Sequence, residues 1–304
     1  MSTELIKILR AKTSAGMIDC KKALIETEND VNKAVEWLRK KGLSTAAKKS
    51  SRVAAEGLVA GKISADKKIG TLVELNSETD FVALNDKFQN LVHDIADLAL
   101  GFNDLEILKN SKFGSSSTVS EEIIQIIASI GENITLRRVH SLSVTNGVVG
   151  CYIHNKVAEG SGKIATLVAL ESDGDKKILE NLAYNIAMHI TSSNSLYLKR
   201  SDIPSGILEK EQEVFSEQVK ALGKPHEVML NIVKGKLEGF YKQNVLLEQP
   251  YIKDNSISIQ DLIVQSSKEI GSNIEIKSFV KYVLGEGIEL QKSDFAAEVE
   301  KMIR

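Results

Sequence analysis

The side chains that could do chemistry in this sequence are its histidines, its cysteines and one glycine-rich stretch. The five histidines are scattered, and none forms a His-x-x-x-His pair or the Cys/His spacing of a metal site. Gly160-Ser161-Gly162-Lys163 suggests a phosphate-binding loop, but Val157 stands where that loop needs glycine, and Ile164 where it needs Ser or Thr. We interpret this stretch as a hairpin turn and expect no catalytic residues, no metal and no cofactor. The absence favours a binding or regulatory protein over an enzyme.

The composition narrows the class of protein further. The 304 residues suggest two domains, or one core with appendages, and the 39 basic and 41 acidic side chains give a net charge of −2. That balance excludes a nucleic-acid-binding surface over the whole chain. No apolar run approaches the roughly 18 to 20 residues of a membrane span, and the N-terminal residues lack a signal peptide's apolar region. Because Cys20 and Cys151 form no disulfide framework, we expect a cytoplasmic protein that binds neither membrane nor nucleic acid.

Positive charge is concentrated near the N-terminus. Residues 1–52 hold 12 basic and 6 acidic side chains, and the stretch 39–52 holds six basic ones and no acid. One interpretation is a solvated helix end and linker, where cations also suit the helix dipole. The other is a patch that steers an acidic partner, and the sequence leaves both open.

Three short helices are expected before residue 43. They cover about 3–12 and 17–26, and a third follows the cap candidate Asp30 and stops at Gly42. Trp37 is expected to contribute much of their small core. Ser44 and Thr45 could cap a further helix, which would act as a tether to the rest of the chain.

The rest of the sequence contains an internal duplication. Ile69-Gly-Thr-Leu-Val-Glu-Leu75 resembles Ile164-Ala-Thr-Leu-Val-Ala-Leu170, at an offset of 95 residues. Each copy reads strand, strand, helix, helix, strand. This predicts an α+β fold with two small antiparallel sheets, each covered by helices on one face. The expected strands are 58–63, 69–75, 134–139, 148–153, 164–170 and 274–280.

A change of offset locates an insertion in the second copy. Between its two helices the offset rises from 91 to 140, so this copy gains 49 residues. Apolar residues at heptad spacing on both sides of Gly223-Lys224-Pro225 predict an antiparallel coiled-coil hairpin. We expect this arm to project from the core and to contact another chain.

The first copy carries an extra segment of its own. It is four residues longer between Leu75 and Asn90 than its twin, and the interval holds Thr79-Asp80-Phe81-Val82, whereas the twin has no aromatic residue there. A feature that only one copy has is a candidate for function. The alternative is that Phe81 fills a gap in the core of the first copy, and sequence geometry alone does not decide between the two.

Motifs along nearly the whole chain, in a shared order, carry a family resemblance. They are Leu9-Arg10, Thr13-Ser14-Ala15-Gly16-Met17-Ile18-Asp19-Cys20-Lys21-Lys22-Ala23-Leu24, Ala46-Ala47-Lys48-Lys49, Thr79-Asp80-Phe81-Val82-Ala83, Ile130-Gly131-Glu132-Asn133-Ile134 with Arg137-Arg138, Ile186-Ala187-Met188-His189, Leu247-Glu248-Gln249-Pro250-Tyr251, Gly285-Glu286-Gly287-Ile288 and Asp294-Phe295-Ala296-Ala297-Glu298-Val299. With these motifs the sequence resembles the translation elongation factor Ts family, the guanine-nucleotide exchange factors of elongation factor Tu. Ser14 departs from the family's usual glycine, and 103–122 and 155–161 match poorly.

The resemblance implies a domain organisation and a function. The parts would be a ubiquitin-associated-like helical domain with its basic linker (1–54), a core N-subdomain (55–140), a core C-subdomain (141–194 and 246–284), the coiled-coil hairpin (195–245) and a C-terminal module (285–304). The chain would bind elongation factor Tu, promote GDP release by disturbing its magnesium and phosphate site, and bind no nucleotide itself. The hairpin would allow a homodimer. The implied contacts are Thr79, Asp80, Phe81 and Val82 at the magnesium site, with Ile130, Gly131, His154, Met17, Ile18, Cys20 and Lys21 elsewhere.

Two rival functions remain. A non-exchange interaction scaffold would explain the helical domain and the arm, but not the segment present in one copy only. A nucleic-acid binder acting through 39–52 would show steep salt dependence, and the acidic remainder of the chain argues against it.

Overall fold

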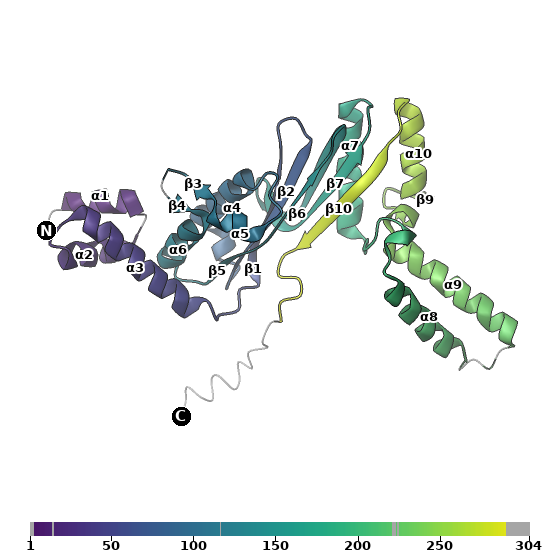
Figure 1. Ribbon diagram of the computed structural model, residues 1–304, viewed down its shortest axis with the longest axis horizontal. Helices are drawn as coiled ribbons and strands as arrows, with labels where there is room; N and C mark the ends of the chain where they lie inside the picture. The colour runs from purple at the N-terminus through teal and green to yellow at the C-terminus, as the bar shows by residue number, and fades with distance from the viewer. Residues whose placement is uncertain (1–2, 14, 116, 221–222, 224, 290–304) are drawn as a thin grey trace.

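A computed structural model describes residues 3–13, 15–115, 117–220, 223 and 225–289 (Figure 1). The molecule is elongated, with three N-terminal helices at one end, the sheet in the middle, and a pair of helices that projects at the other end.

The N-terminal helices are α1 (Thr3–Thr13), α2 (Met17–Glu26) and α3 (Val31–Lys49). Asp30 caps α3, because its carboxylate accepts hydrogen bonds from the backbone N–H groups of Asn32 and Lys33 at 2.9 and 3.0 Å. Partly buried side chains, Trp37 among them, surround a small core. That core consists of Leu9, Cys20, Ala23, Leu24 and Ala34.

The prediction that the third helix stops at Gly42 is wrong, since α3 continues without interruption to Lys49. Gly42 is buried, and a Cβ there would lie 3.4 Å from the side chain of Ile124 on α6 (Val119–Ile130). The missing side chain thus lets α3 approach α6 closely, and this packing outweighs the poor helix propensity of glycine, about 1 kcal/mol. Thr45 lies inside the helix, where its hydroxyl donates to the Lys41 carbonyl at 3.0 Å.

Both copies of the duplication have the predicted order of elements. The first contains β1 (Glu56–Ile63), β2 (Ile69–Ser77), α4 (Asp86–Leu98), α6 and β5 (Ile134–Ser143), and the second β6 (Gly147–Ala158), β7 (Ser161–Glu171), α7 (Lys176–Ser192), α10 (Ile259–Ile270) and β10 (Glu275–Val283). The short elements between them are η1 (Val82–Leu84), α5 (Leu105–Asn110), β3 (Lys112–Phe113), β4 (Ser117–Thr118), η2 (Arg200–Asp202), η3 (Leu246–Glu248), β8 (Pro250–Tyr251) and β9 (Asp254–Ser258).

The strands of the two copies differ from the prediction of two separate sheets. They form one antiparallel six-stranded sheet in the order β10-β7-β1-β2-β5, and β6 also pairs with β7. The copies join where Val59 pairs with Gly162 and Ala60 with Ser161. The glycine-rich stretch makes this junction possible, because Gly160 has a φ of +73° and a Cβ at Gly162 would lie 2.7 Å from the His154 carbonyl oxygen. It is a hairpin turn, as the sequence predicts.

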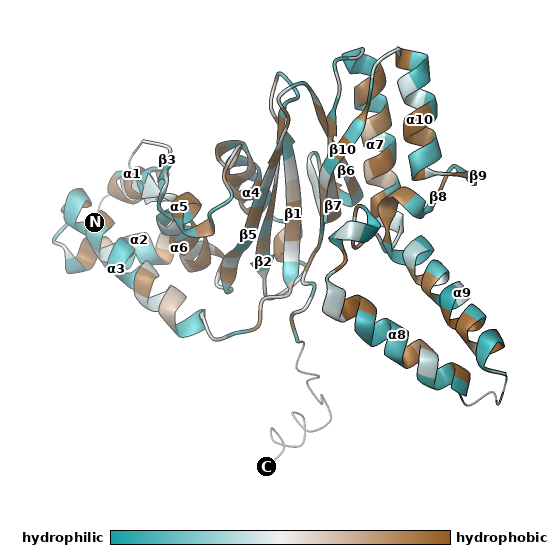
Figure 2. Cartoon of the chain, turned by 45° about the vertical axis from the view of Figure 1, so that its right-hand side comes forward, coloured by the Kyte–Doolittle hydropathy of each residue, from teal (hydrophilic) through white to brown (hydrophobic). Residues whose placement is uncertain are grey.

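Each half of the sheet buries both of its faces. Along β1, Leu58 and Ala60 pack against helices of the first copy, whereas Val59 packs against residues of the second copy, including Leu167. Figure 2 shows the apolar residues gathered along the strands and on the inner faces of the helices. Burial on both faces explains why these strands read as nearly continuous apolar runs.

The insertion in the second copy is a helical hairpin, α8 (Ser205–Lys220) and α9 (His226–Asn244). The two helices lie side by side and project from the sheet (Figure 1). Pro225, with a φ of −55°, immediately precedes α9. Positions 221, 222 and 224 of the predicted turn lie outside the described residues, as do 290–304 of the predicted C-terminal module.

Candidate functional site

The candidate site lies just beyond β2, where η1 turns the chain towards α4. The side chain of Phe81 is 78% exposed and that of Leu84 is 67% exposed. Between them, Val82 and Ala83 are buried in the hydrophobic core of the first copy. The alternative that Phe81 fills this core is therefore wrong, because the ring points to solvent while its neighbours anchor the turn.

The turn that carries Phe81 is held by its own backbone. The N–H of Ala83 donates to the carbonyl of Asp80 at 3.1 Å, and the N–H of Leu84 donates to the carbonyl of Phe81 at 3.2 Å. Asp80 thus contributes a backbone carbonyl to the turn, and its exposed side chain does not cap η1. From α4, the side-chain amide of Gln89 donates to the Ala83 carbonyl at 2.9 Å.

The structure joins the loop before Phe81 to the segment that follows the predicted contacts Ile130 and Gly131. Gly131 ends α6 in the left-handed conformation, with a φ of +89°, and the chain then enters β5 through Glu132. The Glu132 carboxylate accepts hydrogen bonds from Thr79, at 2.9 Å from its backbone N–H and 2.7 Å from its hydroxyl. The loop before Phe81 and the turn after α6 are therefore one connected surface.

His154 lies elsewhere, exposed on β6. The Tyr152 hydroxyl is 3.4 Å from its Nδ1, and the two rings stack with centroids 6.2 Å apart. Among the described residues, no hydrogen bond or ring contact joins His154 to Phe81.

The predicted N-terminal contacts lie on α2 and divide into two groups. Met17 and Ile18 are 59% and 71% exposed, and Lys21 is exposed beside them. Cys20 is instead fully buried, and burial raises the pKa of its thiol. Cys20 and Val82 therefore support neighbouring exposed residues from inside, and neither side chain is itself available for contact.

Sequence reasoning missed two exposed apolar residues that extend these surfaces. Ile25, 56% exposed, follows Ile18 by two helical turns on α2, and Leu84 follows Phe81 by three residues in η1. Helical spacing from the predicted contacts could have identified both.

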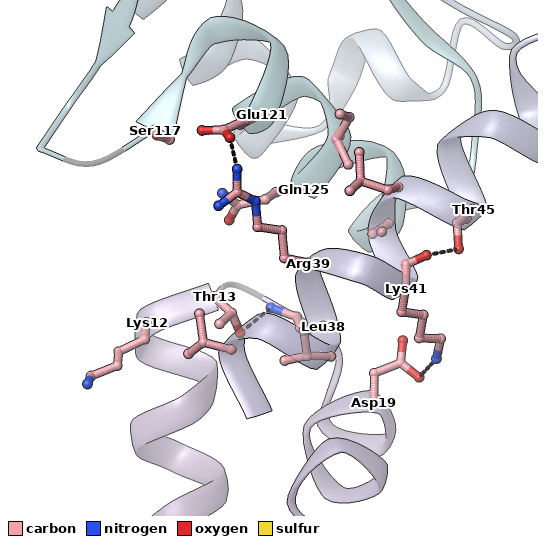
Figure 3. A pocket seen from close by; sticks show the side chains of 16 residues that line it. Lys12, Thr13, Asp19, Leu38, Arg39, Lys41, Thr45, Ser117, Glu121 and Gln125 are labelled. Atoms are coloured by element: carbon pink, nitrogen blue, oxygen red, sulfur yellow. Dashed lines mark hydrogen bonds and ion pairs between the residues drawn. The ribbon is translucent and has the colours of Figure 1, made fainter. Parts of the chain in front are cut away.

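Two cations of the basic stretch 39–52 make ion pairs within the chain, one to the core and one among the N-terminal helices. The Arg39 guanidinium contacts the carboxylate of Glu121 on α6, and the Lys41 ammonium lies 2.6 Å from the carboxylate of Asp19 (Figure 3). Both flank a cavity of about 250 Å³ between α3 and α6. Arg39 and Lys41 are therefore paired within the chain, whereas Lys40 and Lys48 are exposed, so these contacts account for only part of the stretch.

Metal and membrane sites are not evident in the described part of the chain. No group of three or more His, Cys, Asp and Glu side chains there could hold a metal ion. None of the described helices combines the length and apolar character needed to span a bilayer.

Comparison with known proteins identifies the family of this chain. The family model described as Elongation factor TS matches residues 78–286. Elongation factor Ts of Rickettsia bellii (strain OSU 85-389) is 46% identical over 98% of this chain and 96% of its own length. The relatives of the same name from Rhodospirillum centenum (strain ATCC 51521 / SW) and Methylorubrum extorquens (strain PA1) are 47% and 48% identical, over 99% and 100% of this chain and 98% and 99% of their own. The chain belongs to the elongation factor Ts family.

Proposed function

We propose that this chain binds elongation factor Tu in its GDP state and promotes GDP release by disturbing the magnesium and phosphate site. The observation that carries the proposal is the 78% exposure of Phe81, in a turn whose neighbouring side chains are buried. A large exposed aromatic ring on a fixed turn suits insertion into another protein. The chain makes and breaks no bond in this process, so it acts as an exchange factor and not as an enzyme.

The free energy for exchange comes from burial of Phe81 in the partner. Burying an exposed aromatic side chain stabilises a complex by about 2 kcal/mol or more. If this burial occurs only when the magnesium site is disturbed, the exchange factor and GDP are negatively coupled. Linkage makes the coupling reciprocal, so GDP weakens the binding of the exchange factor by the same factor.

The remaining contacts extend the proposed interface beyond Phe81. Ile130 and Gly131 lie beside the Phe81 loop through the hydrogen bonds of Glu132. The exposed face of α2, with Met17, Ile18 and Lys21, forms a second contact, and His154 a third. Thr79 and Val82 hold the loop that presents Asp80 and Phe81.

A binding experiment tests the proposal directly. Immobilised chain should capture nucleotide-free elongation factor Tu, and addition of GDP with magnesium should release it. An interaction scaffold without exchange activity would hold the partner equally in both conditions. Nucleotide-independent capture would therefore favour the scaffold over the exchange factor.

We also retain the predicted domain boundaries, the cytoplasmic location and hairpin-mediated self-association as proposals. Separate buried clusters in the N-terminal helices, the first copy and the second copy support a division into parts, and a fourth cluster joins the two copies. Apolar side chains are exposed on α8 and α9, where Val214 and Leu230 are 47% and 56% exposed. Sedimentation equilibrium of the full chain and of a Val214→Glu/Leu230→Glu variant tests self-association. If the variant still forms dimers, the exposed apolar face of α8 and α9 is excluded as the dimer interface.

A further inference from the structure

Two glutamates exchange hydrogen bonds across the base of the Phe81 loop. The Glu132 carboxylate accepts from the backbone N–H and the hydroxyl of Thr79, at 2.9 and 2.7 Å. In the opposite direction, the Glu78 carboxylate accepts from the backbone N–H of Asn133 at 2.6 Å. We call these four residues the glutamate clamp. Hydrogen bonds to ionised carboxylates are stronger than neutral ones, so the clamp fixes two segments that are 53 to 55 residues apart in sequence.

The clamp and the core fix Phe81 from both sides. Thr79 lies two residues before Phe81, and Val82, immediately after it, is 4% exposed. Hydrogen bonds before Phe81 and packing after it therefore fix the backbone on both sides of this residue. The Phe81 side chain takes no part in these contacts, so its ring is held at a fixed position that faces solvent.

The segment after α3 supports the clamp on its outer side. The Arg52 guanidinium lies 3.4 Å from the Glu78 carboxylate, and the Arg52 carbonyl accepts from the side-chain amide of Asn133 at 2.7 Å. The Lys49 ammonium donates to the Gly131 carbonyl. These cations offset the repulsion expected between two carboxylates at one site.

The second copy of the duplication provides an internal comparison. At the offsets of the repeat, Asp173 stands in the place of Glu78 and Ser272 in the place of Glu132. Here the two segments approach through the hydroxyls of Ser172 and Ser272, 3.4 Å apart. Within the described residues, neither segment sends a carboxylate to the backbone of the other. The fold therefore forms without a clamp, and the clamp accompanies the only copy that has an aromatic residue in this segment.

We propose that Glu132, assisted by Glu78, is a positioning residue for nucleotide exchange: it orders the Phe81 loop before the partner binds. This inference rests on the proposed function. A loop that is ordered only on binding loses affinity to the conformational entropy of its residues. Glu132 removes that loss through Thr79 and does not itself enter the partner.

The test is the release of fluorescent GDP from elongation factor Tu, measured by stopped flow at subsaturating exchange factor. Glu132→Ala should lower stimulated release about tenfold, the order expected when a loop loses its pre-ordering hydrogen bonds. Glu132→Gln should retain most of the rate, because its amide can still accept from the Thr79 N–H and donate to the Thr79 oxygen. Glu269→Ala, an exposed glutamate on α10, is the matched control and should release GDP at the wild-type rate.

A double variant separates positioning from other roles. If Glu132 acts through Phe81, Glu132→Ala should have little further effect in a Phe81→Ala background. An undiminished tenfold loss in that background would overturn the positioning role, as would wild-type release by Glu132→Ala while Phe81→Ala is slow. Wild-type release by Phe81→Ala would instead overturn the proposed function. If Glu132→Ala melts at a markedly lower temperature than the wild type, Thr79→Val replaces it as the test variant. Thr79→Val deletes the hydrogen bond from the Thr79 hydroxyl to Glu132 and retains the one from the backbone N–H.

Discussion

Replacement of Phe81 by alanine is the most direct perturbation of the proposed mechanism. An aromatic side chain buries about 150–250 Å² when fully enclosed, and 78% of Phe81 is exposed in the free chain. At about 25 cal/mol per Å², enclosing that exposed part contributes about 3–5 kcal/mol. Alanine retains about 1 kcal/mol of this, so the net loss of about 2–4 kcal/mol corresponds to a fall of about 30- to 1,000-fold in stimulated release.

The same exposure predicts almost no effect of Phe81→Ala on the fold. An exposed side chain contributes little to stability, so the free energy of unfolding should change by less than about 0.5 kcal/mol. Stopped flow with fluorescent GDP gives the release rate, and urea unfolding gives the stability. Ile107→Ala is the matched control, because Ile107 is an exposed apolar residue of the same copy, 60% exposed on α5. Wild-type release from a folded Phe81→Ala variant would refute the reasoning.

Three further predictions concern the stability of the chain. Gly42→Phe should destabilise the chain by about 1–3 kcal/mol in urea unfolding, because a side chain there pushes α3 away from α6. Arg138→Met should cost about 1–3 kcal/mol, measured in the same way, because it removes one charged hydrogen bond to the buried Glu74 carboxylate and leaves that of Arg137 in place. Burial lowers the pKa of His189 below its ordinary 6.5, against a hydrogen bond with Gln249 that raises it. The unfolded chain therefore takes up this proton first as pH falls, so stability should decline from pH 6.5 downwards, and His189→Gln should flatten that decline in unfolding curves.

Those parts of the fold that depend on local periodicity could be predicted from the sequence. Apolar residues at strand and helix spacing gave the order of elements in both copies, and the change of offset located the hairpin. The connection of the halves could not be predicted, because it consists of the pairs Val59–Gly162 and Ala60–Ser161. No periodic pattern marks two such pairs. Gly42 was misread for a related reason, since a tertiary contact overrides its local propensity.

Part of the candidate site could be predicted from the sequence, and part required the structure. The extra segment in one copy pointed to Phe81, but only the exposed fraction of the residue in the structure shows that its ring faces solvent. The partners of the basic stretch were hidden, because Arg39 and Glu121 lie 82 positions apart, as do Lys49 and Gly131. From charge alone, a solvated helix end and a steering patch were therefore both open, whereas the structure shows contacts within the chain for Arg39, Lys41 and Lys49.

A bulge in the sheet also fixes the strand that leads to Phe81. Glu74 on β2 pairs with Arg138 on β5, and the next pair is Leu75 with Leu136, so Arg137 is the extra residue of a β-bulge. In a regular strand, Arg137 and Arg138 would point to opposite faces. The bulge lets both guanidinium groups reach the Glu74 carboxylate, Arg137 at 3.0 Å and Arg138 at 2.5 Å.

The Glu74 carboxylate also connects the two copies. It accepts from the backbone N–H of Gly285 at 2.9 Å, just beyond β10, and Arg138 lies over the ring of Tyr282. Burial alone would raise the pKa of Glu74, but the hydrogen bonds from Gly285 and Arg138 hold it below its ordinary 4.5. The unfolded chain then binds the proton first, so this stabilisation is complete above pH 4.5 and is lost as pH falls through the folded pKa. Because β2 ends at the Phe81 loop, a contact that joins β2 to β5 and to the segment after β10 gives the exposed ring a rigid base. The proposed insertion of this ring into another protein requires such a base.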